Sequence, residues 1–310
     1  MGTGVGFGKV ILFNEHFVVY GLPAIVSAIG TKTTALVEKA SGAATEMDDR
    51  RPETPGYKAE KLREQQESLQ RILKFMNIDT EHNRFKITLA GDLIAASGIG
   101  ASAASCAAIA RAFSEELGLN YSDEQVNQAA YEGEKGYHGT PSGIDNTAAT
   151  YGGLIWYKRD GGSQIMDRMK LRAPIEIVMG NTGLVADTKI VVAGVRERRE
   201  KAAEEYAQIF KNATELVQEA RKELVALDLP RLGISMNKNH ELLQQIGVSC
   251  DELDDLVKLA RENGALGAKM TGTGRGGYMV ALTPGQELQE RVAVEIERKG
   301  FQALRTTIGT

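Results

Sequence analysis

The feature that most constrains the fold is a glycine-rich segment between a strand pattern and a helix pattern. Phe85, Ile87 and Leu89 alternate with polar residues, as one side of a half-buried strand does. The segment from Gly98 to Gly100 follows, and the run from Ala101 to Phe113 is dominated by alanine and other good helix formers. The chain is therefore expected to turn from a strand into a helix through a loop with little side-chain bulk.

A loop of this kind suits the oxygen atoms of a phosphate group. The first turn of a helix has N–H groups without intrahelical partners and carries about half a positive charge. Glycine lets the backbone approach a ligand closely, and the hydroxyl of Ser102 could complete the shell of a magnesium ion. An ordinary tight strand-to-helix connection would have the same composition, so the loop alone leaves both interpretations open.

The length of the chain predicts two domains. With 310 residues it exceeds what one hydrophobic core usually organises. The composition shifts between Gly180 and Thr188, and we place the boundary there, with domains at residues 1–182 and 183–310. A hydrophobic fraction of 42% and a charged fraction of 25% are typical of a globular protein.

Charge and composition narrow the classes of partner. A net charge of −4 without a basic stripe argues against nucleic acid and favours a small-molecule ligand. The two cysteines are too few for a disulfide scaffold, which suggests a reducing, cytoplasmic compartment. The N-terminal residues do not resemble a signal peptide, and no apolar run approaches the roughly 20 residues that span a bilayer, so no membrane partner is expected.

Hydrophobic periodicity predicts further elements. In the first half we expect two short strands separated by the polar triplet Asn14 to His16, and irregular backbone from Glu134 to Asn146. The expected strands are 10–13, 17–20, 175–179 and 278–282, and the expected helices are 62–76, 123–133, 206–224, 237–245, 253–261 and 288–298.

Two carboxylates and one lysine complete a possible site for phosphoryl transfer. Glu134 and Asp145 are eleven positions apart across a segment interrupted by glycine and proline, so one could hold magnesium while the other contacts a hydroxyl. Lys9 follows a glycine at a strand start, where its ammonium could neutralise developing charge. Taken alone, such an acidic pair or a single lysine more often lies on a solvated surface. Together with the loop they supply a phosphate cradle, a metal ligand and a group that positions the nucleophile.

A second glycine cluster extends from Thr271 to Gly277, just before the strand expected at 278–282. A dinucleotide-binding fingerprint would instead follow a first strand and open a helix, so a nicotinamide cofactor is not expected. The sequence also lacks the G-x-x-x-x-G-K-[ST] motif and the protein-kinase signatures. A flexible hairpin explains this second cluster as well as a ligand loop does.

These segments, taken in order, resemble the motifs of the GHMP kinases, the superfamily of galactokinase, homoserine kinase, mevalonate kinase and phosphomevalonate kinase. The first motif, from Gly8 to Gly21, is similar to that of the mevalonate kinase family. The second motif corresponds to residues 98–104 and the third to residues 269–277, and both are most similar to the kinetoplastid-type sequences. Residues 140–146 match the stretch around the catalytic aspartate, and residues 193–196 match the stretch after the substrate-contacting threonine, here Thr188.

The resemblance implies a fold and an activity. The fold is α+β, with an N-terminal domain that contains a left-handed βαβ crossover and a C-terminal α/β sandwich domain. The activity is transfer of a phosphoryl group from ATP to the C5 hydroxyl of (R)-mevalonate, with Mg²⁺, which gives 5-phosphomevalonate and ADP for isoprenoid synthesis. The family also implies a possible homodimer.

The resemblance further implies residue roles. Asp145 would be the catalytic base, and Lys9 would orient and tune its carboxylate. Ser102 and Glu134 would hold the metal. Mevalonate would contact Lys9, Glu15, His16, Asp145 and Thr188, and the ATP phosphates would contact Ala96, Ser97, Gly98, Ile99, Gly100, Ala101, Ser102 and Ala103.

Three positions depart from the family pattern. Asn14 and Arg275 stand where glycine is usual, and asparagine tolerates left-handed backbone better than most residues. Ala101 replaces the first serine of a serine pair and removes one hydroxyl.

The alternatives to mevalonate phosphorylation are another GHMP kinase, such as a phosphomevalonate kinase, and a non-catalytic ATP-binding sensor. A sensor would have no need to keep the full set of chemical residues described above.

Overall fold

The chain folds into two compact units, each built from two stretches of sequence. The structure is a computed structural model that describes residues 1–41, 44–53, 56–95, 98–160 and 163–309. Unit 1 comprises Met1–Lys9 and Ala28–Gly152, and unit 2 comprises Val10–Ser27 and Gly153–Thr310. The domain boundary that we placed after residue 182 on sequence grounds stays a prediction.

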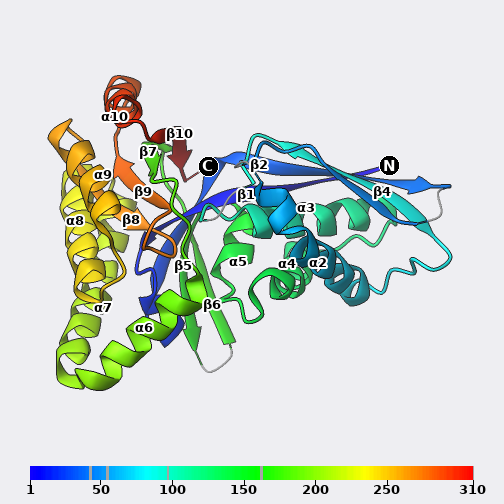
Figure 1. Ribbon diagram of the computed structural model, residues 1–310, viewed down its shortest axis with the longest axis horizontal. Helices are drawn as coiled ribbons and strands as arrows, with labels where there is room; N and C mark the ends of the chain where they lie inside the picture. Colours follow the sequence, from blue (N-terminus) through cyan, green and yellow to red (C-terminus); the bar gives the residue numbers. More distant parts are fainter. Residues whose placement is uncertain (42–43, 54–55, 96–97, 161–162, 310) are drawn as a thin grey trace. The chain divides into compact units, whose positions relative to one another are not determined.

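Unit 1 combines a sheet with a layer of helices (Figure 1). In its sheet β4 is antiparallel to β2, and β3 is parallel to β4 and joined to it through α1 and α2, which is a βαβ crossover. The helices predicted from residues 62 and 101 and the strand predicted around Ile87 are all present. Its elements are β1 (Gly2–Phe13, as far as Lys9), β2 (Ala24–Ala40, from Ala28), β3 (Glu46–Asp49), α1 (Tyr57–Glu60), α2 (Leu62–Phe75), β4 (Arg84–Gly91), α3 (Ala101–Glu116), α4 (Asp123–His138) and α5 (Ile144–Tyr151).

An unusually close contact between β1 and α3 organises unit 1. Gly2, Gly4 and Gly6 alternate along β1 and therefore lie on the same side of the strand. A Cβ atom at any of them would lie 2.0–2.2 Å from a carbonyl oxygen of α3. These oxygens belong to Ala112, Ala108 and Ala104, respectively. Only glycine permits this separation, so the alternating glycines set the distance between the strand and the helix that follows the glycine-rich loop.

Unit 2 contains a four-stranded antiparallel sheet in the order β10-β7-β9-β8. Helices α8 and α9 pack against β8, and α10 packs against β10 and β7. The predicted strand at 278–282 is confirmed, as are the predicted helices. The further elements are η1 (Phe17–Tyr20), β5 (Leu154–Asp160), β6 (Ser163–Met169), β7 (Ile175–Asn181), α6 (Thr188–Lys201), α7 (Ala203–Ala226), α8 (Leu229–Gln245), α9 (Asp251–Glu262), β8 (Gly267–Thr271), β9 (Tyr278–Leu282), α10 (Gln286–Arg298) and β10 (Gln302–Ile308).

Two local predictions were wrong. The segment Phe17–Tyr20 is a 3₁₀ turn rather than a strand, because the positive φ angles of His16 (60°) and Gly21 (83°) reverse the chain at both ends. Helix α4 continues through Glu134 to His138, where we expected irregular backbone. The glycines there serve packing: a Cβ at Gly133 would lie 2.8 Å from side chains of α2 and α3, and one at Gly136 would lie 2.5 Å from the α2 backbone.

No helix in the described ranges is long and apolar enough to cross a bilayer.

We predict that Gly6→Ala lowers the free energy of unfolding by at least about 3 kcal/mol, since the new methyl group must displace either β1 or the backbone of α3. Urea unfolding followed by circular dichroism measures the change. Gly194→Ala is the matched control, because Gly194 lies within α6 and its Cβ would meet only the end of the flexible Arg198 side chain at 3.1 Å. An equal effect of both substitutions would contradict the packing argument.

Candidate active site

The glycine-rich loop leads into α3 with two residues in the left-handed region. Gly98 has φ 102° and Gly100 has φ 78°, and α3 begins at Ala101. A Cβ at Gly100 would lie 2.6 Å from Cγ of Lys9, so the loop needs glycine here both for its backbone angle and for the passage of the lysine side chain. Of the predicted phosphate-binding residues, Gly98, Ile99, Gly100, Ala101, Ser102 and Ala103 form the loop and the first turn of α3, whereas Ala96 and Ser97 lie outside the described residues.

Lys9 pairs with Asp145. The backbone N–H of Lys9 donates to the carbonyl oxygen of Ile99 at 2.9 Å, which fixes the strand to the loop. Its Nζ lies 3.1 Å from Oδ1 of Asp145, with the lysine buried and 32% of the aspartate side chain exposed. The Asp145 carboxylate is therefore accessible to solvent or to a ligand, and its ion pair with the buried Lys9 ammonium fixes its position.

The neighbours of Asp145 anchor its helix. Asp145 lies in the first turn of α5, after Gly143 at φ 87°. Asn146 donates from its amide to Oδ1 of Asn127 on α4 at 2.7 Å, and the Thr147 hydroxyl donates to the Gly143 carbonyl at 2.6 Å. Asn146 thus attaches α5 to α4, and Thr147 bonds the first turn of α5 to the residue that precedes the helix.

Glu134 is a buried carboxylate in the same unit. Its pKa is raised from 4.5 to about 8, chiefly by burial and then by the negative charge of Asp145, while a hydrogen bond with Ser102 and the charge of Lys9 act to lower it. Its Oε1 has no hydrogen-bond partner among the described residues, and its Oε2 lies 3.7 Å from Nε2 of His138. A buried carboxylate beside a hydroxyl supplies the oxygen ligands that Mg²⁺ prefers, so Glu134 and Ser102 fit the predicted metal site.

Unit 2 brings together two of the predicted substrate residues. Nε2 of His16 donates to the carbonyl oxygen of Thr273 at 2.7 Å, and the hydroxyl of Thr188 lies 2.8 Å from that of Thr273. Burial lowers the pKa of His16 to about 4, so its imidazole is neutral near pH 7 with the proton on Nε2. Thr273, in the second glycine cluster, joins both residues and was missing from the sequence-based list of site residues.

Glu15 forms an ion pair with Lys269, and both side chains are almost completely buried. Nζ of Lys269 also donates to the carbonyl oxygen of Met270 at 2.6 Å. Burial raises the pKa of Glu15, and the attraction of Lys269 opposes this shift. In the sequence Lys269 stands out only as the first residue of the third motif. A lysine flanked by the small and apolar residues Ala268 and Met270 is the only signal in the sequence for a buried charge, and it does not identify the partner.

The departures from the family pattern at Asn14 and Arg275 are accommodated. Asn14 has φ 69°, and its amide donates to the carbonyl oxygens of Pro23 (2.8 Å) and Ala213 (3.0 Å). Arg275 has φ 55°, and its guanidinium donates to the carbonyl oxygen of Gly247 at 2.9 and 3.1 Å. Both residues take the left-handed backbone of the usual glycine, as expected for Asn14, and their side chains add contacts.

Comparison with known proteins identifies the class. A model of the GHMP kinases N terminal domain matches residues 67–153, and a model of the GHMP kinases C terminal region matches residues 220–302. The chain belongs to the GHMP kinases, and the predicted α+β fold with two such domains is confirmed.

Within this superfamily the chain belongs to the mevalonate kinases. It is 34% identical to a mevalonate kinase of Thermococcus sibiricus over 97% of this chain and 94% of that protein. It is also 34% identical to a mevalonate kinase of Pyrococcus furiosus, over 93% and 91% of the two chains. The crystal structure of L. major mevalonate kinase in complex with R-mevalonate is 42% identical, with a TM-score of 0.96 over 99% of this chain and 96% of that one.

We predict a pH-dependent stability difference between the metal-free protein and its Glu134→Gln variant. With a pKa near 4.5 unfolded and about 8 folded, the folded state holds an extra proton between these values. The contribution of Glu134 is therefore full below pH 4.5 and is lost as the pH rises towards 8, so the stability of the wild type relative to the variant should fall by about 1.4 kcal/mol per pH unit. Urea unfolding in the presence of a chelator measures it, with Glu132→Gln as the control on the same helix. A difference independent of pH would contradict the assignment.

We predict that Lys269→Met lowers the free energy of unfolding by about 3–5 kcal/mol, because it leaves the Glu15 carboxylate buried without its partner. The double variant Glu15→Leu/Lys269→Met should recover most of this loss, since an apolar pair of similar volume needs no counter-charge. Lys258→Met removes an exposed lysine near Glu262 and should change stability by less than about 1 kcal/mol. A double variant no more stable than Lys269→Met would refute the charge-pair explanation. Urea unfolding distinguishes these outcomes.

Proposed function

We propose that the protein transfers the γ-phosphoryl group of ATP to the C5 hydroxyl of (R)-mevalonate and releases 5-phosphomevalonate and ADP. The observation that carries this proposal is the 42% identity, over nearly the whole length, to an enzyme crystallised with R-mevalonate. The Lys9–Asp145 ion pair and the buried Glu134 beside Ser102 supply the groups that such a transfer needs.

The phosphates of ATP would lie on the loop that precedes α3 and on its first turn. The first N–H groups of α3 have no partner within the helix, and the helix dipole favours negative charge at this end. Glu134 and Ser102 would hold Mg²⁺, which neutralises charge on the phosphate oxygens when it is bound. Binding of the metal requires the Glu134 carboxylate to lose its proton, so the cation and the proton compete for this residue.

Asp145 would accept the proton of the C5 hydroxyl while the hydroxyl oxygen forms a bond to the γ-phosphorus. The bond between that phosphorus and the bridging oxygen of ADP breaks, and ADP leaves with the electron pair. Lys9 holds the Asp145 carboxylate in place at 3.1 Å, and its buried ammonium favours the negative charge that develops on the transferred group. Alignment and charge neutralisation supply most of the acceleration in this proposal.

Glu15, His16 and Thr188 would contact mevalonate. His16 is neutral and donates from Nε2 to Thr273, so its remaining ring nitrogen can accept a hydrogen bond from a substrate hydroxyl. The Thr188 hydroxyl forms a hydrogen bond with the Thr273 hydroxyl, so the two side chains lie next to each other. A homodimer and a cytoplasmic location complete the proposal.

A coupled assay of ADP release with ATP and Mg²⁺ tests the function. We expect turnover with (R)-mevalonate and little or none with phosphomevalonate, galactose or homoserine, since differential transition-state binding favours the acceptor that the site orients. Faster turnover with phosphomevalonate would show that mevalonate is not the preferred acceptor. Silence with all four acceptors, while ATP still binds, would favour a sensor.

In the same assay Asp145→Asn should lower kcat by about 100-fold or more, because the amide cannot accept the proton. Asp123→Asn is the matched control, since Asp123 also lies in the first turn of a helix of unit 1 but pairs with Arg111 at the surface. Near-normal turnover of Asp145→Asn, with its fold and ATP affinity intact, would show that the catalytic role is assigned wrongly.

A further inference from the structure

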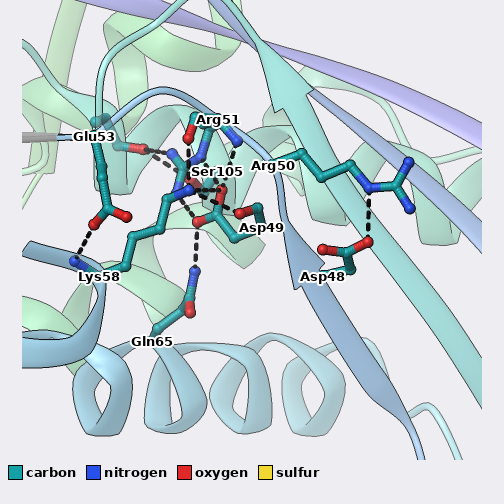
Figure 2. A network of polar contacts seen from close by, with 9 residues as sticks. Asp48, Asp49, Arg50, Arg51, Glu53, Lys58, Gln65 and Ser105 are labelled. Atoms are coloured by element: carbon teal, nitrogen blue, oxygen red, sulfur yellow. Dashed lines mark hydrogen bonds and ion pairs between the residues drawn. The ribbon is translucent and has the colours of Figure 1, made fainter.

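A buried arginine in unit 1 makes contacts that none of the assigned roles explains. The Arg51 guanidinium forms a two-point ion pair with Asp49 at the end of β3, with Nε–Oδ1 at 2.9 Å and Nη2–Oδ2 at 2.6 Å. The side chains of both residues are less than one-tenth exposed. Figure 2 shows this pair at the centre of a group of polar side chains, which we call the Arg51 network: Asp49, Arg51, Lys58, Gln65 and Ser105.

The third arm of the guanidinium reaches the start of α3. Nη1 of Arg51 donates to the carbonyl oxygen of Ala101 at 3.1 Å and to the hydroxyl of Ser105 at 2.6 Å. The Ser105 hydroxyl in turn donates to the same Ala101 carbonyl at 2.8 Å. One guanidinium thus connects the end of β3 to the first turn of the helix that the glycine-rich loop opens.

The hydrogen bond from Arg51 to the Ala101 carbonyl also affects the next residue, Ser102. The peptide bond is planar, so the carbonyl of Ala101 and the N–H of Ser102 belong to one rigid plane and point in opposite directions. A hydrogen bond that fixes the carbonyl therefore also fixes the direction of the Ser102 N–H. That N–H is one of the groups proposed to bind ATP phosphates, and the Ser102 side chain is a proposed metal ligand.

The remaining members of the network hold Arg51 rigidly. Nζ of Lys58 donates to the carbonyl oxygens of Asp49 at 2.7 Å and of Arg51 at 2.5 Å. The Gln65 amide on α2 donates to Oδ2 of Asp49 at 3.0 Å. Arg51 and Lys58 also line, together with Ser102, a cavity of about 20 Å³. The network that holds the arginine therefore draws on four elements, β3, α1, α2 and α3, beside the start of α3.

We propose that Arg51 is a positioning residue for ATP: it orients the Ala101–Ser102 peptide and so presents the Ser102 N–H and hydroxyl to the phosphate groups. The inference rests on the proposed function only in taking ATP as the ligand. This positioning role requires the planar, three-nitrogen guanidinium of arginine, because a single ammonium cannot reach both Asp49 oxygens and the two acceptors on α3 at once.

The test compares Arg51→Lys and Arg51→Met with the wild type in ATP binding by calorimetry, in steady-state kinetics and in thermal unfolding. We expect the dissociation constant and the KM for ATP to rise by about 10-fold or more in Arg51→Met, and by less in Arg51→Lys. The KM for mevalonate should stay within about twofold of the wild type, since the change is confined to the phosphate-binding turn.

Arg50→Met is the matched control. Arg50 is the preceding residue, but it points away from the network to an exposed ion pair with Asp48 (Figure 2). This variant should bind ATP like the wild type. Should Arg51→Met fail to fold, Arg51→Lys and Ser105→Ala carry the test, and each is expected to weaken ATP binding by at least about threefold, because each removes part of the hydrogen bonding at the start of α3.

A purely structural arginine would give a different result. In that case the Arg51 variants would unfold at lower temperature with unchanged ATP affinity, and this outcome would overturn the proposal. An Arg51→Lys variant with wild-type affinity would overturn the requirement for the guanidinium. If the wild type bound ATP but phosphorylated no acceptor, the proposed reaction would fail while the comparison of ATP affinities would still decide the role of Arg51.

Discussion

The close contact between β1 and α3 is the constraint on which unit 1 depends. Three alternating glycines bring the strand so near the helix that any side chain would collide with helix carbonyl oxygens. Lys9 lies further along the same strand, and the glycine-rich loop opens the same helix. One packing distance therefore determines both where the lysine stands and where the N–H groups of the helix begin. Gly100 has no side chain because Lys9 passes at that point.

Both units contain buried charged groups, some of which are paired with an opposite charge. Glu15 is paired with Lys269, which lies far away in sequence, and Asp49 is paired with its near neighbour Arg51. Arg51 reaches a distant segment through its hydrogen bonds to α3. Glu134 differs, because its carboxylate is buried near the negative Asp145 and its pKa is raised to about 8. A group that is costly to ionise in the empty protein becomes favourable to ionise when a divalent cation binds. The burial of Glu134 thus supports the proposed metal role.

The positions that depart from the family pattern show what the backbone requires. Asn14 and Arg275 both adopt positive φ angles, and each uses its side chain to bind carbonyl oxygens nearby. Ala101 lacks the usual hydroxyl, but its carbonyl oxygen accepts from both Arg51 and Ser105. The chemistry of the loop then depends on backbone groups, on Ser102 and on the arginine that orients their shared peptide.

Most of the helices, the two glycine clusters and the reactive residue types could be predicted from the amino-acid sequence, because hydrophobic period and helix-start signals are local properties of the chain. The sequence also carried the family motifs that named Lys9, Ser102, Glu134 and Asp145 together. It did not reveal why β1 alternates glycines, that Phe17–Tyr20 is a 3₁₀ turn, or that Lys269, Thr273 and Arg51 have partners far away in sequence. These features emerge only in the folded chain, since a close approach between elements or a buried ion pair depends on which distant segments pack together, and no local pattern contains that information.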